Sequence, residues 1–308
     1  MFKFKISFFF LFLFITYYLP FPVSFTYASS ILEQPIGVRC LGLGETFSGL
    51  NSDLSDIFWN PAGLYNIKNK EINLNYYNSF MDTALTGVLF GTKLKNNAGS
   101  IGAGFVSYDG GSMEIVDEND NAVTVKALSE SLGIVSYSNR VIEISDEKSL
   151  IMGANFKTLQ SKLVEQYSAQ AYAVDLGLLY RYVNDKNFSF GIAVQNIGSQ
   201  LKYFETAEQL PVKLRISIGY NIIQMLLYNL QVLAETTNNM QDRQQETSLG
   251  AEYTYARLVS FRVGYKTGNM DKLTYGMGIN IKGYVFDYGK VLLGSIENMD
   301  QLSLGIKF

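Results

Sequence analysis

The chain has 308 residues and a formal net charge of −3, with 27 Gly, 21 Tyr, 21 Phe and no His. The absence of His excludes Ser-His-Asp and Cys-His catalysis and most zinc sites. The small net charge, without a basic cluster, argues against a nucleic-acid partner. We therefore expect a protein that is not an enzyme, with no catalytic residue, no metal and no cofactor.

The first 28 residues are expected to form a secretory signal peptide. Lys3 and Lys5 precede an apolar run at 6–19, Pro20 ends that run, and small residues follow up to a cleavage position near Ala28. A transmembrane helix is the alternative, but it needs about 20 apolar residues and this run is shorter. The mature protein is thus expected outside the cytoplasm.

Residues 29–70 show no strand-like alternation and are expected to form a separate segment. Asp53, or Ser52 beside it, is placed to cap a short helix. Pro61 forces Asn60 out of the helical region, which ends the helix, and Gly63 then allows a tight turn. We interpret this motif as a structural anchor, with contact to a ligand as the alternative.

From residue 71 onward, apolar and polar residues alternate in segments bounded by turn residues. Fourteen strands are expected, and single-chain bacterial outer-membrane barrels have an even number. They lie at 71–79, 84–94, 98–108, 128–138, 149–162, 168–182, 187–196, 211–222, 227–237, 245–255, 257–266, 272–282, 284–291 and 300–308. The segments at 84–94 and 128–138 alternate poorly.

The connections fit the same fold class, an all-β transmembrane antiparallel barrel. Short inward turns are expected at 95–97, 183–186 and Gly283, with a longer one at 139–148; the outward loops, longer on average, are 109–127, 197–210, 238–244 and 292–299. Short periplasmic turns and longer outer loops are typical of membrane barrels. A soluble β-sandwich or solenoid is the alternative, but neighbouring strands look hairpin-linked and no repeat period appears.

Aromatic residues gather near the strand ends, where membrane barrels have interfacial girdles. They are Tyr76, Tyr108, Tyr180, Tyr182, Tyr220, Tyr255, Tyr265 and Tyr284. The preference of aromatic residues for strands is the simpler explanation.

The last strand places Leu302, Leu304, Ile306 and Phe308 on one face. An apolar strand at the end of a chain is tolerated where a closed barrel meets lipid. It looks like the closing strand of an outer-membrane barrel, which commonly ends in Phe. We expect Phe308 to be the signal that the barrel-assembly machinery reads, and outer-membrane lipid to surround the wall.

Charged residues also fall on the inward-facing positions of the expected strands. We expect them to form a network that holds the N-terminal segment, with a substrate pathway as the alternative. They are Asp175, Arg181, Arg215, Glu235, Glu252, Arg262 and Asp287.

Several motifs resemble the PorV/PorQ family of bacterial outer-membrane proteins. They are the run at 42–45, Asp-x6-Asn-Pro-Ala-Gly-Leu at 53–64, Gln195-Asn196-Ile197-Gly198, Pro211 before Lys213 and Arg215, and the ending at 303–308. The resemblance implies a FadL-like barrel of fourteen strands over 71–308 with a plug at 29–70. It also implies a bacterial outer-membrane location.

The same resemblance implies a binding or shuttle component that handles exported proteins beside a secretion apparatus. Its partners would then be secretion-system components or exported proteins. The alternative is a FadL-like channel for uptake of hydrophobic small molecules, and a structural surface protein is a third possibility. Shorter outer loops than a fatty-acid transporter carries favour the first reading.

Overall fold

The computed structural model describes residues 31–49, 53–78, 82–116, 120–145, 147–183, 188–204, 207–241, 244–268, 271–292 and 298–308. The expected signal peptide at 1–28 and the alternative helix cap Ser52 lie outside these residues. None of the helices in the described part is long and apolar enough to cross a membrane.

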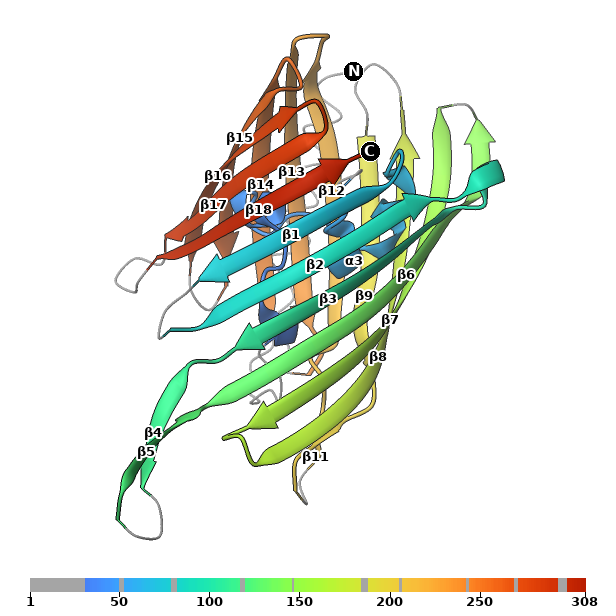
Figure 1. Ribbon diagram of the computed structural model, residues 1–308. Helices are drawn as coiled ribbons and strands as arrows, with labels where there is room; N and C mark the ends of the chain where they lie inside the picture. Colours follow the sequence, from blue (N-terminus) through green and yellow to red (C-terminus); the bar gives the residue numbers. More distant parts are fainter. Residues whose placement is uncertain are drawn as a thin grey trace.

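Within the described residues, fourteen strands form one closed antiparallel barrel (Figure 1). The strands are β1 (Glu71–Asn78), β2 (Ala84–Lys93), β3 (Ser100–Asp109), β6 (Leu128–Ser145), β7 (Lys148–Leu163), β8 (Tyr167–Tyr182), β9 (Phe188–Gly198), β12 (Lys213–Gln224), β13 (Tyr228–Asn239), β14 (Gln245–Tyr255), β15 (Val259–Thr267), β16 (Lys272–Ile281), β17 (Tyr284–Leu292) and β18 (Met299–Lys307). Each pairs with its neighbour along the chain, and β18 pairs with β1 to close the ring. The predicted fold is confirmed, including the strands expected at 84–94 and 128–138.

The long turn expected at 139–148 is wrong, because β6 continues to Ser145 and β7 begins at Lys148. The β-branched residues Val141, Ile142 and Ile144 favour an extended backbone. Two register shifts, at Arg140/Ile142 and at Glu143/Ser145, interrupt the alternation there. A bulge of this kind prevents the prediction of a strand from the alternation of apolar and polar residues.

The apolar face of the wall points outward and the polar face points inward. On β18, Leu302 is 54% exposed whereas Gln301 is 3% exposed. In a bilayer the outward side chains meet lipid, and the closed ring satisfies the backbone hydrogen bonds internally. The wall is therefore built to cross a membrane as a closed β-barrel. Tyr108 differs from the expected girdle, since it is buried in the core inside the barrel.

The two ends of the barrel differ in the length of their connections. At one end, which we call the turn end, β1 begins, β18 ends, and tight turns such as the one at Gly283 join the strands. At the other, the loop end, the hairpin of β4 (Ser112–Val116) and β5 (Ala122–Lys126) projects away from the wall (Figure 1). The connection from β9 to β12, at the same end, contains the short strand pair β10 (Leu201–Lys202) and β11 (Ala207–Glu208). Short turns face the periplasm in such barrels, so we expect the turn end to be periplasmic.

Residues 31–49 and 53–67, which we call the N-terminal segment, lie inside the barrel (Figure 1). They form the short helices η1 (Ile31–Glu33), α2 (Val38–Gly42), α3 (Asp56–Trp59) and η2 (Pro61–Asn66), whereas η3 (Lys95–Asn97) lies in a turn. Phe47, Ile57 and Trp59 of the segment share a buried core with Leu89 and Leu132 of the wall. The segment starts near the loop end, where the Ile31 N–H donates to Glu130 at 2.7 Å, and leads into β1 at the turn end.

Small residues on the inner wall make room for this segment. A Cβ at Gly153 would overlap the backbone of Pro61, and a Cβ at Gly177 would overlap the Asn60 side chain. A Cβ at Gly264 would overlap the backbone of Gly44. The glycines of the inward face therefore follow the path of the segment through the lumen.

Candidate functional site

Asn60 fastens the N-terminal segment to itself and to the wall. Pro61 keeps Asn60 extended, at φ −152° and ψ 104°, and the Asn60 Oδ1 accepts the Ala62 N–H at 3.1 Å, which caps η2. Its Nδ2 donates to the carbonyl oxygens of Ser48, at 2.8 Å, and of Leu178 in β8, at 3.1 Å. The buried Asn60 amide thus joins two parts of the segment and one wall strand.

Asp53 and Gly63 act differently from what the sequence predicts. The Asp53 carboxylate accepts the N–H of Ser55 at 2.9 Å, but Ser55 is the N-cap of α3, and its side chain makes no capping bond. Gly63 lies within η2 instead of in a turn to the wall, and a Cβ there would overlap the carboxyl group of buried Asp56. Gly63 is therefore required for close packing and not for a positive φ.

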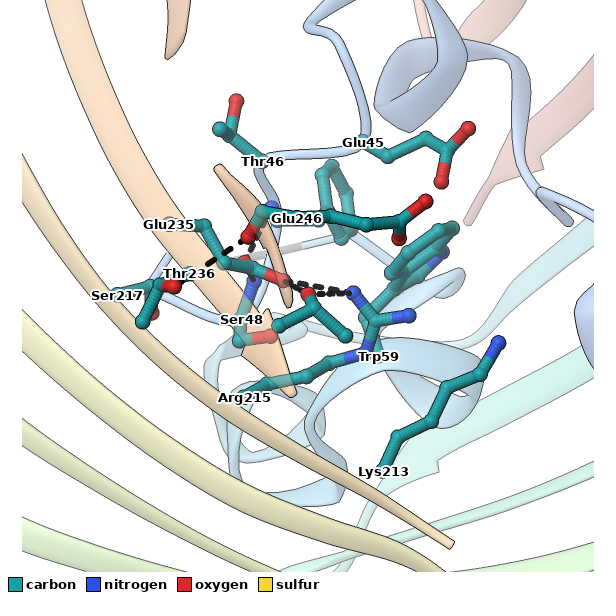
Figure 2. A network of polar contacts seen from close by, with 12 residues as sticks. Glu45, Thr46, Ser48, Trp59, Lys213, Arg215, Ser217, Glu235, Thr236 and Glu246 are labelled. Atoms are coloured by element: carbon teal, nitrogen blue, oxygen red, sulfur yellow. Dashed lines mark hydrogen bonds and ion pairs between the residues drawn. The ribbon is translucent and has the colours of Figure 1, made fainter. Parts of the chain in front are cut away.

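A first cluster of lumen charges is built around Arg215 and Glu235 (Figure 2). The Arg215 Nη1 donates to the Glu235 Oε1 at 2.7 Å, and the guanidinium lies 4.4 Å from the ring centroid of Trp59. The Glu235 Oε2 accepts the backbone N–H groups of Phe47 at 3.0 Å and Ser48 at 2.9 Å. Both charged groups of this pair therefore contact the N-terminal segment, Arg215 at Trp59 and Glu235 at the backbone N–H groups.

A second cluster joins Arg39 of the segment to three wall residues. Arg39 binds Glu252 bidentately, with Nη2 to Oε1 at 2.6 Å and Nε to Oε2 at 2.9 Å. Arg262 donates to the same Glu252 Oε2 at 2.7 Å and to the Asp287 Oδ1 at 2.6 Å. Bidentate arginine–carboxylate pairs have defined geometry, so the position of α2 on the wall is fixed.

Asp175, in the middle of β8, belongs to a third cluster that also involves β7 and β9. Its Oδ2 accepts from the Lys157 ammonium and from Asn155, each at 2.7 Å, and its Oδ1 accepts the Asn196 N–H at 2.8 Å. The Asn155 amide also donates to the Ile57 carbonyl oxygen at 2.7 Å. The remaining predicted charge, Arg181, lies away from these clusters and donates to the Asn66 Oδ1.

Sequence reasoning missed several lumen charges that also bind the segment. Lys266 pairs with Glu45 at 2.6 Å, and Lys213 pairs with Glu33 at 2.8 Å. Lys157, paired with Asp175, was missed as well. The sequence did contain a signal for them, because residues an even number of positions apart lie on the same face of a strand. Lys266 therefore shares a face with Arg262, and Lys213 shares one with Arg215.

The N-terminal segment contains a buried carboxyl group, that of Glu45, whose pKa is lowered. Burial opposes ionisation of Glu45, but the charges of Lys266 and Lys272 outweigh it and lower the pKa of its carboxyl to about 2. In the described part of the chain, no group of three or more Cys, Asp and Glu side chains is arranged to hold a metal ion. The chemistry of these contacts is that of buried ion pairs and hydrogen bonds, which hold the segment in the lumen.

A family model described as "Type IX secretion system membrane protein PorP/SprF" matches residues 131–301. This range is more than half of the chain. The chain belongs to the PorP/SprF family. The motifs of the sequence resemble PorV/PorQ, whereas the matching model is that of PorP/SprF, so the expectation holds at the level of an outer-membrane barrel family of type IX secretion. Among curated proteins, none matches the chain.

Solved structures of transporters share the fold of this PorP/SprF chain. The toluene transporter TodX of Pseudomonas putida has a TM-score of 0.61 at 9% identity, covering 87% of this chain and 96% of TodX. The toluene transporter TbuX of Ralstonia pickettii has a TM-score of 0.57 at 11% identity, covering 89% and 98%. A FadL homologue of Pseudomonas aeruginosa has a TM-score of 0.50 at 10% identity, covering 94% and 100%. At this identity the likeness concerns the FadL-like fold alone.

Proposed function

We propose that this PorP/SprF barrel is a non-enzymatic component that binds or shuttles exported proteins at the outer membrane, beside the type IX secretion apparatus. The role of a shuttle is the one that the PorV/PorQ-like motifs imply. Secretion-system components and exported proteins would be its partners, and the barrel-assembly machinery would insert it. The family match carries this proposal.

The contents of the lumen support binding over conduction. Three charge clusters of the wall engage the N-terminal segment, through Glu235, Glu252 and Asn155. A wall whose polar groups hold a segment of its own chain has few left for a passing solute. The segment would therefore be a plug, and binding would take place at the loop end.

The β4–β5 hairpin is the surface that we assign to protein partners. The hairpin is a sheet of only two strands, β4 and β5. Each strand therefore has an outer edge whose backbone groups are not paired with another strand. Val116 is 69% exposed there, and Met113 and Val123 are exposed as well. Exposed edges with apolar side chains are suited to pairing with an extended strand of another chain.

Crosslinking in intact cells tests this function. A photo-crosslinking side chain at Val116 or Val123 is expected to capture an exported protein or a secretion component, identified by mass spectrometry. The matched control is Val135, whose exposure lies between those of Val116 and Val123 but which lies on the lipid face of β6. Capture at Val135 alone, or at none of the three positions, would contradict the proposal.

The alternative is a FadL-like channel for hydrophobic small molecules, which the fold shared with toluene transporters favours. A hydrophobic-probe binding assay on the purified protein separates the two functions. Saturable probe binding that Asn60→Ala weakens, together with no protein crosslink from the hairpin, would favour the channel.

A further inference from the structure

The turn end of the barrel carries an excess of positive charge. Its described residues are 68–71, 93–99, 140–145, 147–148, 181–183, 222–228, 255–259, 280–284 and 306–308. Among them the side-chain carboxylates are those of Glu71, Glu143 and Glu147, and the lysines and arginines are more numerous. The exposed and half-buried cations that we call the turn-end belt are Lys70, Lys95, Lys148, Arg257, Lys282 and Lys307.

The charge of the turn end differs from that of the rest of the chain. The whole protein has a formal net charge of −3. At the loop end, carboxylates predominate among the described residues, as at Asp109, Glu114, Glu165 and Asp271. The cations are therefore concentrated at one end of the barrel, and the overall composition does not explain them.

The turn-end belt follows the circumference of the barrel. Its cations lie in the β2–β3, β6–β7, β14–β15 and β16–β17 turns and at the β1–β18 junction, which form a continuous arc of the ring from β14 through β18 and β1 to β7. Two further cations of this end, Lys93 and Arg181, instead bond to Tyr65 and Asn66 of the N-terminal segment. Lipid surrounds a membrane barrel, whereas a docked protein contacts one sector of it. An arc of this length is therefore suited to lipid.

Exposed apolar and aromatic side chains flank the cations at the same level of the wall. Lys282 lies between Ile281 and Tyr284, which pair across the turn and are 52% and 54% exposed. Arg257 lies in the turn that follows Tyr255, which is 44% exposed. Tyrosine and long cationic side chains are typical of the headgroup level of a bilayer, where the stem of the cation packs on apolar surface and its charge reaches the polar groups.

The belt cations have few anionic partners within the chain. Among the described residues, no side-chain carboxylate lies within ion-pair distance of Lys95, Arg257 or Lys282, whereas Lys307 pairs with Glu71 at 3.5 Å. Like charges along an arc repel one another, so negative charge from outside the chain would stabilise this end. The headgroups of anionic lipids supply such charge at the level of the cations.

We propose that the turn-end belt binds the phosphate groups of anionic phospholipids in the adjacent leaflet, which is the periplasmic one in the expected orientation. The cations hold the turn end at the depth of the headgroups, with Tyr255 and Tyr284 beside the same headgroups. This surface lies at the opposite end from the β4–β5 hairpin, and the inference does not depend on the proposed function.

The lipid preference of the reconstituted barrel tests the proposal. The full-length protein is placed in phosphatidylcholine bilayers that contain a trace of spin-labelled phosphatidylglycerol or spin-labelled phosphatidylcholine. Electron spin resonance separates the lipids that contact the wall from the bulk lipids. Phosphatidylglycerol is expected to associate at least about 2-fold more strongly than phosphatidylcholine at low salt. The preference should disappear at about 1 M salt, where the screening length is about 3 Å.

Variants locate the preference at the turn end. A triple variant, Lys95→Gln, Arg257→Gln and Lys282→Gln, removes cations without a described carboxylate partner and is expected to reduce the preference at least by half. The matched control removes the same charge at the loop end, through Lys162→Gln, Lys202→Gln and Lys290→Gln, and both ends contact phosphatidylglycerol in a symmetric bilayer. Unboiled and boiled gel mobility reports whether each variant is folded. An unchanged preference in the folded turn-end variant, or an equal loss in both variants, would overturn the proposal.

Other anionic partners give different outcomes in the same assay. Sodium phosphate should weaken the preference no more than sodium chloride of equal ionic strength, because the site is a headgroup surface and not a pocket for a free anion. A larger loss in phosphate would assign the cations to a soluble phosphate compound. Equal association of phosphatidylglycerol and phosphatidylcholine with the parent protein at low salt would exclude lipid and leave the belt to an acidic protein.

Discussion

Glu71, the first residue of β1, lies directly opposite Lys307, the last residue of β18, and their charged groups are 3.5 Å apart. Next to this pair, the Phe308 N–H donates to the Lys70 carbonyl oxygen at 2.9 Å. The two ends of the strand set are therefore fixed to each other at the turn end. The Phe308 side chain is 64% exposed, so a bilayer or another protein can contact it.

The exposed Phe308 side chain leads to a prediction about assembly. Phe308→Ala removes one outward aromatic, worth about 1.5–3 kcal/mol of burial in lipid. We expect a larger loss of folded protein than this value explains, because the assembly signal is removed as well. The measurement is the amount of heat-modifiable barrel in outer-membrane fractions. Phe286→Ala is the matched control, since Phe286 is a similarly exposed outward aromatic on neighbouring β17. Equal yields of the two variants would show that the terminus is not read.

Arg215→Met should destabilise the barrel strongly. It leaves Glu235 buried without its cation, and losing one partner of a buried pair costs about 3–5 kcal/mol. The midpoint of urea unfolding, followed by gel mobility, measures the effect. Lys126→Met is the control, because Lys126 forms a solvent-exposed pair with Asp109, and such pairs contribute about 1 kcal/mol or less. A Glu235→Gln, Arg215→Met double variant that recovers stability would support the buried charge as the cause.

Removing residues 29–66 should open an aqueous path through the barrel. The inward face that remains carries glycines and charges such as Arg262 and Asp287, which water and small ions can contact. In planar bilayers the full chain is expected to be nearly non-conducting, whereas the shortened chain should show stable openings. A shortened barrel that folds but does not conduct would contradict a plug role for the segment.

The pH dependence of stability should report on the Glu45–Lys266 pair. The folded pKa of Glu45, about 2, lies below its ordinary value of 4.5, so folding favours the ionised form. Its stabilising contribution is present above pH 4.5 and is lost as the pH falls toward 2. Glu45→Gln should thus be less stable than the parent at pH 6 and equally stable near pH 2, measured by urea unfolding. A difference that stays constant over this range would argue against the ion pair.

The strand set was accessible from the sequence because a strand repeats every two residues, so local alternation is enough to find it. The extension of β6 past Arg140 was not, since bulges interrupt the alternation. Arg215, Glu235 and Glu252 were assigned to the inward face because they alternate with apolar residues along their strands. The partners of these charges depend on the register between strands and on the position of the N-terminal segment, and neither can be read from local sequence patterns.

The N-terminal segment was the least predictable part for the same reason. The cap at Asn60 follows from Pro61 and is a local effect. The role of Gly63 depends on the distant approach of Asp56, and the role of Gly153 on the approach of Pro61, so neither is visible in the neighbouring sequence. Arg181 was expected in the ion-pair network, but its described partner is the Asn66 amide.

The junction between β1 and β18 has a consequence for the order of assembly. A ring that joins β1 to β18 is complete only after β18 has been made. The N-terminal segment comes before β1 and is enclosed by all parts of the ring, with Trp59 and Phe47 in its interior. Once the ring is closed, these bulky side chains have no route inward through its hydrogen-bonded wall. We therefore expect the strands to assemble around the N-terminal segment before β18 pairs with β1.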